Sequence, residues 1–262
     1  MGQLLNFRCQ REFRVDCMQP PTRGKQITYP MANRFFTAES LAPGSFVLDG
    51  AEAHHLAHVR RLGVGDEATL FNGNGREYRA IVIATDKRQV ALNVVEVSEP
   101  DRELGFRLHV GTALPKGDRL DFLIEKLTEL GATDFTPLFT ERSIVVARAG
   151  KVEKMQRLVV EASKQCGRNV LMRVHSPLSL TEWCAIDEHP ATKRIAHPGG
   201  AAHATLHSDC RDIAIAIGPE GGFTEQELTA ASETGFCPVS LGSRLLRIET
   251  AALAAVAWLG SR

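Results

Sequence analysis

From Phe106 to the C-terminus, strand-like apolar segments alternate with amphipathic helical segments. The strand candidates are RLHVGTAL, DFTPLF, RIAHP, DIAIAIG and PVSLG, and the helix candidates include GDRLDFLIEKLTELG, KVEKMQRLVVEASKQCG and the C-terminal alanine-rich segment. This alternation is typical of a parallel sheet that is covered by helices on both faces. We therefore predict that residues 103–262 form an α/β domain.

Residues 34–97 have a different pattern, in which short strand candidates surround one short helical segment at residues 51–62. The sequence NGNG at residues 72–75 predicts a hairpin turn, since both residue types tolerate a positive φ. The charged segment at residues 98–105 is typical of a linker. We expect a small barrel-like β domain at residues 31–102. Residues 1–30 lack periodicity, and we expect a disordered leader or an over-extended start before Met31.

Composition excludes several classes of protein. Lys and Arg number 31, as do Asp and Glu, so only local basic patches would attract a polyanion. No apolar run reaches the roughly 18–20 residues of a membrane span. The six cysteines form no CxxC pair, which fits a cytoplasmic protein without a zinc ribbon. His54, His55 and His58 lack nearby acids or cysteines, so we expect no metal.

The most informative motif is GPEGG at residues 218–222, which directly follows a buried strand. Thr224 and Glu227 then form the pattern of a capping box, which predicts a helix start. Glycines at the carboxyl end of a parallel strand allow a ligand to approach the backbone. Because Glu220 would repel a phosphate and no Walker A or GxGxxG pattern is present, a cationic ligand or one with adenine groups fits better.

Two further segments carry weaker signals. HPGG at residues 197–200 follows another strand and is interpreted as a second glycine loop. In LGSRLLRIET at residues 241–250, Arg244 and Arg247 lie in an apolar stretch and need partners or an anionic ligand.

Together, GPEGGFTEQE and VSLGSRLLRIETAALAA resemble the signature of the RsmE family. These bacterial enzymes of the SPOUT superfamily methylate N3 of a uridine (uridine 1498) in 16S ribosomal RNA. The segments LPKGDRLDFLIEKLTELG, TPLFTERS and EASKQCGRN follow the family's order, and the resemblance extends from Asn33 to the C-terminus. Ile248 departs from the pattern, since the family more often has threonine there.

The resemblance implies a PUA-like β-barrel for RNA, followed by a SPOUT-type α/β domain with a trefoil knot. It further implies a cytoplasmic homodimer that acts on 16S ribosomal RNA of the small ribosomal subunit, and three loops that bind S-adenosylmethionine. The residues of this chain that match those loops are His197, Pro198, Gly199, Ile217, Gly218, Pro219, Glu220, Gly221, Gly222, Leu241, Gly242, Leu246, Arg247 and Thr250.

Methylation at N3 requires loss of the uracil N3 proton and stabilisation of the charge that develops. We assign charge stabilisation to Arg247 and proton acceptance to Glu249 or Glu220; either carboxylate can instead cap a helix or hold an arginine. The candidate RNA contacts are Arg34, Arg60, Arg61, Lys116, Arg142, Lys164 and Arg168. Three alternatives stay open at this point: ribose 2′-O-methylation, RNA binding without catalysis, and nicotinamide-dependent oxidoreduction. The last fits the α/β alternation, but this sequence lacks the glycine pattern of a dinucleotide-binding site.

Overall fold

The computed structural model describes residues 33–86, 88–145, 149–202 and 212–260. The predicted leader at residues 1–30 lies outside the described residues, as does Met31. No helix in these described ranges is long and apolar enough to cross a bilayer.

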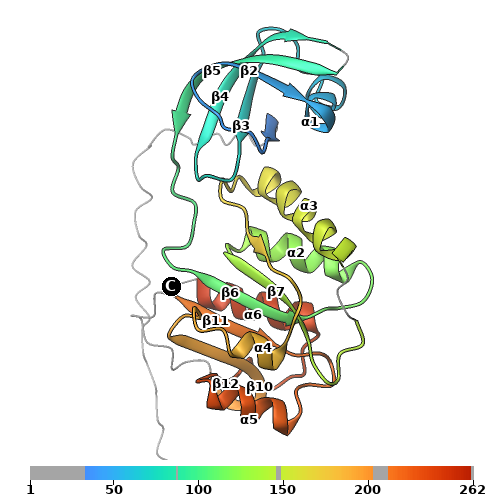
Figure 1. Cartoon of the computed structure of the whole chain (residues 1–262), viewed down its shortest axis with the longest axis vertical. Helices are drawn as coiled ribbons and strands as arrows, with labels where there is room; N and C mark the ends of the chain where they lie inside the picture. Colours follow the sequence, from blue (N-terminus) through green and yellow to red (C-terminus); the bar gives the residue numbers. More distant parts are fainter. Residues whose placement is uncertain (1–32, 87, 146–148, 203–211, 261–262) are drawn as a thin grey trace, which may run out of the picture. The chain divides into compact units, whose positions relative to one another are not determined.

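The N-terminal domain is a five-stranded sheet with the strand order β1-β3-β4-β5-β2 (Figure 1). Its elements are β1 (Arg34–Phe36), β2 (Gly44–Asp49), α1 (Gly50–His54), the π-helix η2 (His55–Val59), β3 (Glu67–Phe71), β4 (Glu77–Thr85) and β5 (Gln89–Ser98). The helix predicted at residues 51–62 is confirmed but is shorter, and its second half, η2, is a π-helix. It ends before Arg61, which has a φ of 56°.

Alternation of side chains builds the core of this domain. In β4 and β5, Tyr78, Ala80, Val82, Val90 and Leu92 are buried, while the residues that alternate with them along each strand are more exposed. Leu56 of η2 packs into the same cluster and is fully buried. The predicted hairpin turn is confirmed between β3 and β4, where two glycines of NGNG take positive φ values of 86° and 89°.

The C-terminal domain is a parallel sheet with the order β12-β10-β11-β6-β7-β8, and β9 also pairs with β7. Its elements are β6 (Leu108–Ala113), α2 (Arg119–Glu129), β7 (Asp134–Phe139), α3 (Ala149–Cys166), β8 (Arg173–Val174), β9 (Leu178–Ser179), α4 (Leu180–Cys184), β10 (Thr192–Ala202), β11 (Ile213–Ile217), α5 (Glu225–Glu233), β12 (Cys237–Ser240) and α6 (Ile248–Gly260). The predicted parallel α/β arrangement is confirmed. The sequence did not predict β8, β9 or α4, which are too short for a periodic signal.

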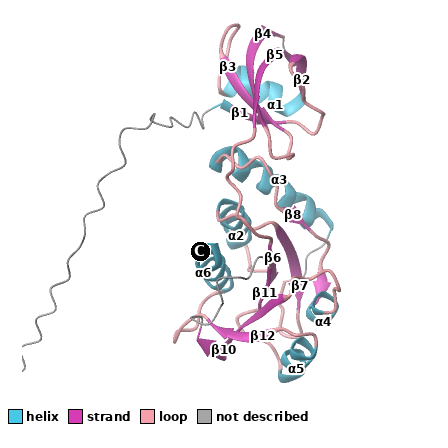
Figure 2. Ribbon diagram, turned by 90° about the vertical axis from the view of Figure 1, so that its left-hand side faces the viewer, coloured by secondary structure: helices cyan, strands magenta, loops and turns pink. Residues whose placement is uncertain are grey.

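The central strand β11 is buried on both faces, which explains its uninterrupted apolar sequence. Ile213, Ile215 and Ile217 pack in the core that contains α2 and α6, whereas Ala214 and Ala216 face α4 and α5. Figure 2 shows these two helix pairs on opposite sides of the sheet. The small alanines therefore leave room for the fully buried Trp183 of α4.

The end of the chain returns to the middle of the sheet. After β11 it crosses to β12 at the far edge, and α6 then packs against α2, β6 and β11. Ile248, the departure from the family pattern, is buried in this core. The expected trefoil knot stays a prediction.

Candidate active site

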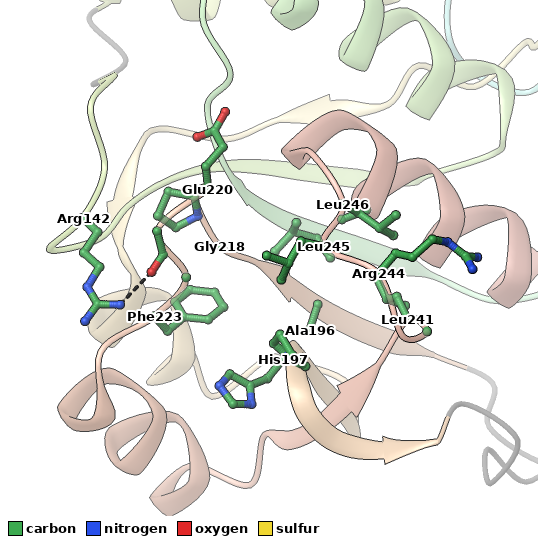
Figure 3. Close-up of a pocket in the computed structure, with 17 residues that line it drawn as sticks. Arg142, Ala196, His197, Gly218, Glu220, Phe223, Leu241, Arg244, Leu245 and Leu246 are labelled. Carbon is green, nitrogen blue, oxygen red and sulfur yellow. Dashed lines mark hydrogen bonds between the residues drawn. The ribbon is translucent and has the colours of Figure 1, made fainter.

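The three predicted segments, together with Arg142 from the segment after β7, meet around a cavity of about 400 Å³ beside the middle of β10 and at the carboxyl ends of β11 and β12 (Figure 3). It is lined by Arg142, Ala196, His197, Pro198, Ile217, Gly218, Pro219, Glu220, Gly221, Gly222, Phe223, Leu241, Gly242, Arg244, Leu245, Leu246 and Ala251. Eleven of the predicted cofactor-binding residues are among them. Gly199, Arg247 and Thr250 are not.

The GPEGG segment forms a tight turn between β11 and α5. Gly222 has a φ of 67° and donates a backbone hydrogen bond to the carbonyl oxygen of Pro219 at 2.8 Å. The predicted capping box is confirmed, since the Glu227 amide donates to Thr224 Oγ1 at 3.2 Å and the Thr224 amide donates to the Glu227 carboxylate at 2.8 Å. The start of α5 thus holds one end of the turn.

Arg142 fastens the other end of this turn. Its Nη1 donates to the carbonyl oxygen of Gly221 at 2.6 Å, drawn as the dashed line in Figure 3. The neighbouring Glu141 amide donates to the Glu227 carboxylate at 2.9 Å. The segment after β7 therefore forms a wall of the cavity, which the sequence analysis did not foresee when it assigned Arg142 to RNA.

The HPGG segment is not a loop after a strand, as predicted, but a bulge inside β10. Pairing between β10 and β12 shifts register between Ala196 and Ala201. Gly200 lies so close to β12 that an added Cβ would be 2.5 Å from the Val239 nitrogen. The bulge presents His197 and Pro198 to the cavity while the strand continues beyond them.

The segment between β12 and α6 forms the fourth wall. Leu241 and Leu246 are partly buried against the core, whereas Leu245 is 89% exposed at the cavity. Arg247 is exposed, and its side chain has no hydrogen-bond or ion-pair partner within the described ranges. Its carbonyl oxygen accepts from the Ala251 amide at 2.8 Å at the start of α6. The catalytic role assigned to Arg247 stays a prediction.

The two candidate proton acceptors share one cation, Arg119. Its Nη1 lies 3.6 Å from an oxygen of Glu220 and 3.6 Å from an oxygen of Glu249. Figure 3 shows the Glu220 side chain turned away from His197 and Phe223. Sequence reasoning missed Arg119, although it lies in the segment LPKGDRL that carries part of the family resemblance.

Three of the predicted RNA contacts are buried in ion pairs instead of exposed. Arg34 pairs with Glu77 at 2.9 Å, Lys164 with Glu52 at 2.8 Å, and Arg168 with Glu103. Each pair joins distant parts of the chain and satisfies a cation that is less than 10% exposed. A buried, paired cation is not available to a phosphate, so these three assignments are corrected to structural roles.

The other four predicted RNA contacts, Arg60, Arg61, Lys116 and Arg142, are exposed. Lys116 lies on the loop between β6 and α2, three residues before Arg119. Within the described part of the chain no group of His, Cys, Asp and Glu side chains is arranged to hold a metal ion.

Two family models match the sequence. The RNA methyltransferase domain matches residues 102–260 and the RNA methyltransferase PUA domain matches residues 48–95. The ribosomal RNA small subunit methyltransferase E of Synechocystis is 34% identical over 92% of this chain and 82% of that protein. That of Bacillus subtilis is 32% identical over 81% of this chain and 88% of that protein.

The chain belongs to the ribosomal RNA small subunit methyltransferase E family.

The family's fold is confirmed by a solved structure. The Neisseria gonorrhoeae ribosomal RNA small subunit methyltransferase E, bound to S-adenosyl methionine, has a TM-score of 0.80 and 33% identity over 86% of this chain and 95% of that chain. The two family models match residues 48–95 and 102–260, so the exact domain boundaries at residues 31–102 and 103–262 stay predictions.

Proposed function

We propose that this member of the RsmE family transfers a methyl group from S-adenosylmethionine to N3 of a uridine in 16S ribosomal RNA. The single observation that carries the proposal is the convergence of the three predicted segments on one cavity. Its volume of about 400 Å³ lies in the range of small-molecule sites, roughly 300–1,000 Å³.

The residues of the cavity fit S-adenosylmethionine. Leu241, Leu246 and Ile217 provide an apolar surface for an adenine ring, and the glycines of GPEGG leave the backbone accessible. Glu220 adds a negative charge to the lining, and its carboxylate lies 3.6 Å from the Arg119 guanidinium. When bound, the sulfonium supplies an already activated methyl group, so the protein has mainly to orient the uracil, exclude water and remove the N3 proton.

RNA binding is proposed for the exposed cations Arg60, Arg61 and Lys116, with Arg247 at the start of α6 as the predicted stabiliser of charge on the base. Because each phosphate contact releases counterions, removal of these exposed cations should weaken binding and flatten its salt dependence.

We also propose that the enzyme is a homodimer that uses α6. This helix is almost entirely apolar, yet Ala254 and Ala257 are exposed on it, and Phe122 of the adjoining α2 is 46% exposed. Sedimentation velocity should show a dimer for the full chain and a monomer for Ala257→Glu. A monomeric wild-type chain would contradict this part of the proposal.

The function is tested by mass spectrometry of nucleosides. Small-subunit particles from cells that lack the gene should gain N3-methyluridine when they are incubated with the protein and S-adenosylmethionine. Ribose 2′-O-methylation in its place would show a different activity on the same fold, and no methylation of any nucleoside would favour an RNA-binding protein without catalysis.

A further inference from the structure

Arg119, the first residue of α2, lies between carboxylates from two different segments of the site. Its Nη1 is 3.6 Å from Glu220 Oε1 and 3.6 Å from Glu249 Oε1. Both separations exceed the usual 2.7–3.2 Å of an N–H···O hydrogen bond. The guanidinium is therefore held by charge, and its N–H groups remain able to donate to a ligand.

Glu249 provides an independent observation. Its side chain is only 9% exposed, and its Oε2 is buried without a hydrogen-bond partner in the part of the chain that the structure describes. An unpaired buried carboxylate oxygen is destabilising, so this one calls for an explanation. A donor on a ligand would satisfy this oxygen.

The imide edge of uracil matches this pair of groups. It presents a carbonyl oxygen, the N3–H donor and a second carbonyl oxygen in a row, whereas Glu249 and Arg119 present an acceptor beside a donor. We propose that Glu249 accepts the N3 proton of the target uracil and that Arg119 donates to the adjacent carbonyl oxygen. Glu220 acts as a positioning residue for Arg119. The inference rests on the proposed function and names the residues that recognise its substrate.

The proposed groups account for each proton and electron pair. As the N3–H bond breaks, the proton moves to the Glu249 carboxylate, and the electron pair is shared by N3 and the carbonyl oxygens. Arg119 stabilises the negative charge on one of those oxygens. The N3 pair then bonds to the methyl carbon while the bond from this carbon to sulfur breaks, and that electron pair stays on sulfur.

The same two groups select uracil over cytosine. Cytosine N3 carries no hydrogen, so its lone pair would face the Glu249 carboxylate, and its amino group can oppose the Arg119 guanidinium. A well-placed pair of polar contacts to a base discriminates by about 1–3 kcal/mol, or roughly tenfold to a hundredfold. The inference therefore predicts base selectivity as well as rate.

The experiment compares Arg119→Ala, Arg119→Lys, Glu249→Gln and Glu220→Gln with two controls. Lys126→Ala removes a cation from the same helix, and Glu233→Gln removes an exposed acid from α5. Three quantities are measured: affinity for S-adenosylmethionine without RNA, single-turnover rate on small-subunit particles across pH, and competition between particles with uridine or cytidine at the target position.

Arg119→Ala and Glu249→Gln should each lower the single-turnover rate about a hundredfold or more and leave donor affinity unchanged. The rate of Glu249→Gln should rise about tenfold per pH unit, because hydroxide must remove the proton. This variant should also lose the preference for uridine, since its amide can donate to cytosine N3. Arg119→Lys should retain part of the single-turnover rate. Glu220→Gln should lower this rate less than Arg119→Ala does, and both control variants should have the wild-type rate.

Two results would overturn the inference. If Arg119→Ala weakens donor binding and saturating S-adenosylmethionine restores its rate, Arg119 holds the donor's carboxylate and does not contact the base. If Glu249→Gln keeps the wild-type rate and pH profile, Glu249 is not the proton acceptor. The affinity for S-adenosylmethionine also shows whether each variant is folded. If Glu249→Gln does not bind S-adenosylmethionine, Glu249→Asp takes its place in the experiment. This variant must show a reduced single-turnover rate with the wild-type pH dependence. A wild-type protein that methylates no uracil refutes the proposed function itself.

Discussion

Replacement of Arg168 by alanine should destabilise the protein without a specific effect on RNA binding. Arg168 is 3% exposed and pairs with both carboxylate oxygens of Glu103, and its Nη1 donates to the carbonyl oxygens of Thr128 at 2.8 Å and Ala132 at 3.0 Å. The substitution removes this donor from the Glu103 carboxylate and the Ala132 carbonyl oxygen, whereas the Thr128 carbonyl oxygen still accepts from the Gly131 amide at 3.2 Å. Breaking a buried ion pair typically costs about 3–5 kcal/mol.

Urea denaturation measures this loss in the free energy of unfolding, and the melting temperature should fall by roughly 6–20 °C, at about 2–4 °C per kcal/mol. Arg157→Ala is the matched control, because it removes the same charge from an exposed position on α3 and should change stability by at most about 0.5 kcal/mol. An Arg168→Ala chain of wild-type stability that loses RNA affinity and salt dependence would refute this reasoning and restore the RNA contact.

Three further predictions follow from the same structure. Gly200→Ala should lower the affinity for S-adenosylmethionine about tenfold or more in calorimetry, because its Cβ would lie 2.5 Å from the β12 backbone. Gly105→Ala is the control, since its Cβ would have no atom within 4 Å. Equal affinities of the two variants would contradict this prediction. Arg142→Ala should weaken donor binding about threefold to tenfold, the value of one net hydrogen bond, with unchanged RNA affinity, and the reverse result would make Arg142 an RNA contact. The His109 Nε2 accepts from Trp183 Nε1 at 3.3 Å and lies 2.8 Å from the Thr136 hydroxyl, and burial lowers the pKa of this ring to about 3. Between about pH 6.5 and 3 the unfolded chain then binds more protons than the folded protein. The free energy of unfolding should therefore decrease as the pH is lowered through this range, by up to about 1.4 kcal/mol per pH unit. His109→Gln should flatten that slope, and a slope equal to wild type would show that His109 is not its source.

Local features of this protein could be predicted because their causes lie within a few residues. The capping box of Thr224 and Glu227 and the positive-φ glycines of NGNG depend on the chemistry of one turn. The apolar sequence of β11 predicted a strand buried on both faces, and the change of rhythm after residue 105 separated the β domain from the α/β domain. The family resemblance added three segments that the structure does bring to one cavity.

The features that sequence reasoning missed all depend on distant partners. HPGG is a bulge and not a loop because β12 pairs with β10 on both sides of it. Arginine side chains usually lie at the surface, but Arg168 is buried, and its hydrogen bonds to Glu103 and to two backbone carbonyl groups satisfy its charge there. Arg119 became a candidate only when the fold placed Glu220 and Glu249 on either side of it. Propensity and turn chemistry act over short stretches of chain, so the sequence by itself determined the elements and the glycine turns. Desolvation and charge pairing depend on which remote groups meet, so only the tertiary structure decided which charged residues are structural and which face the site.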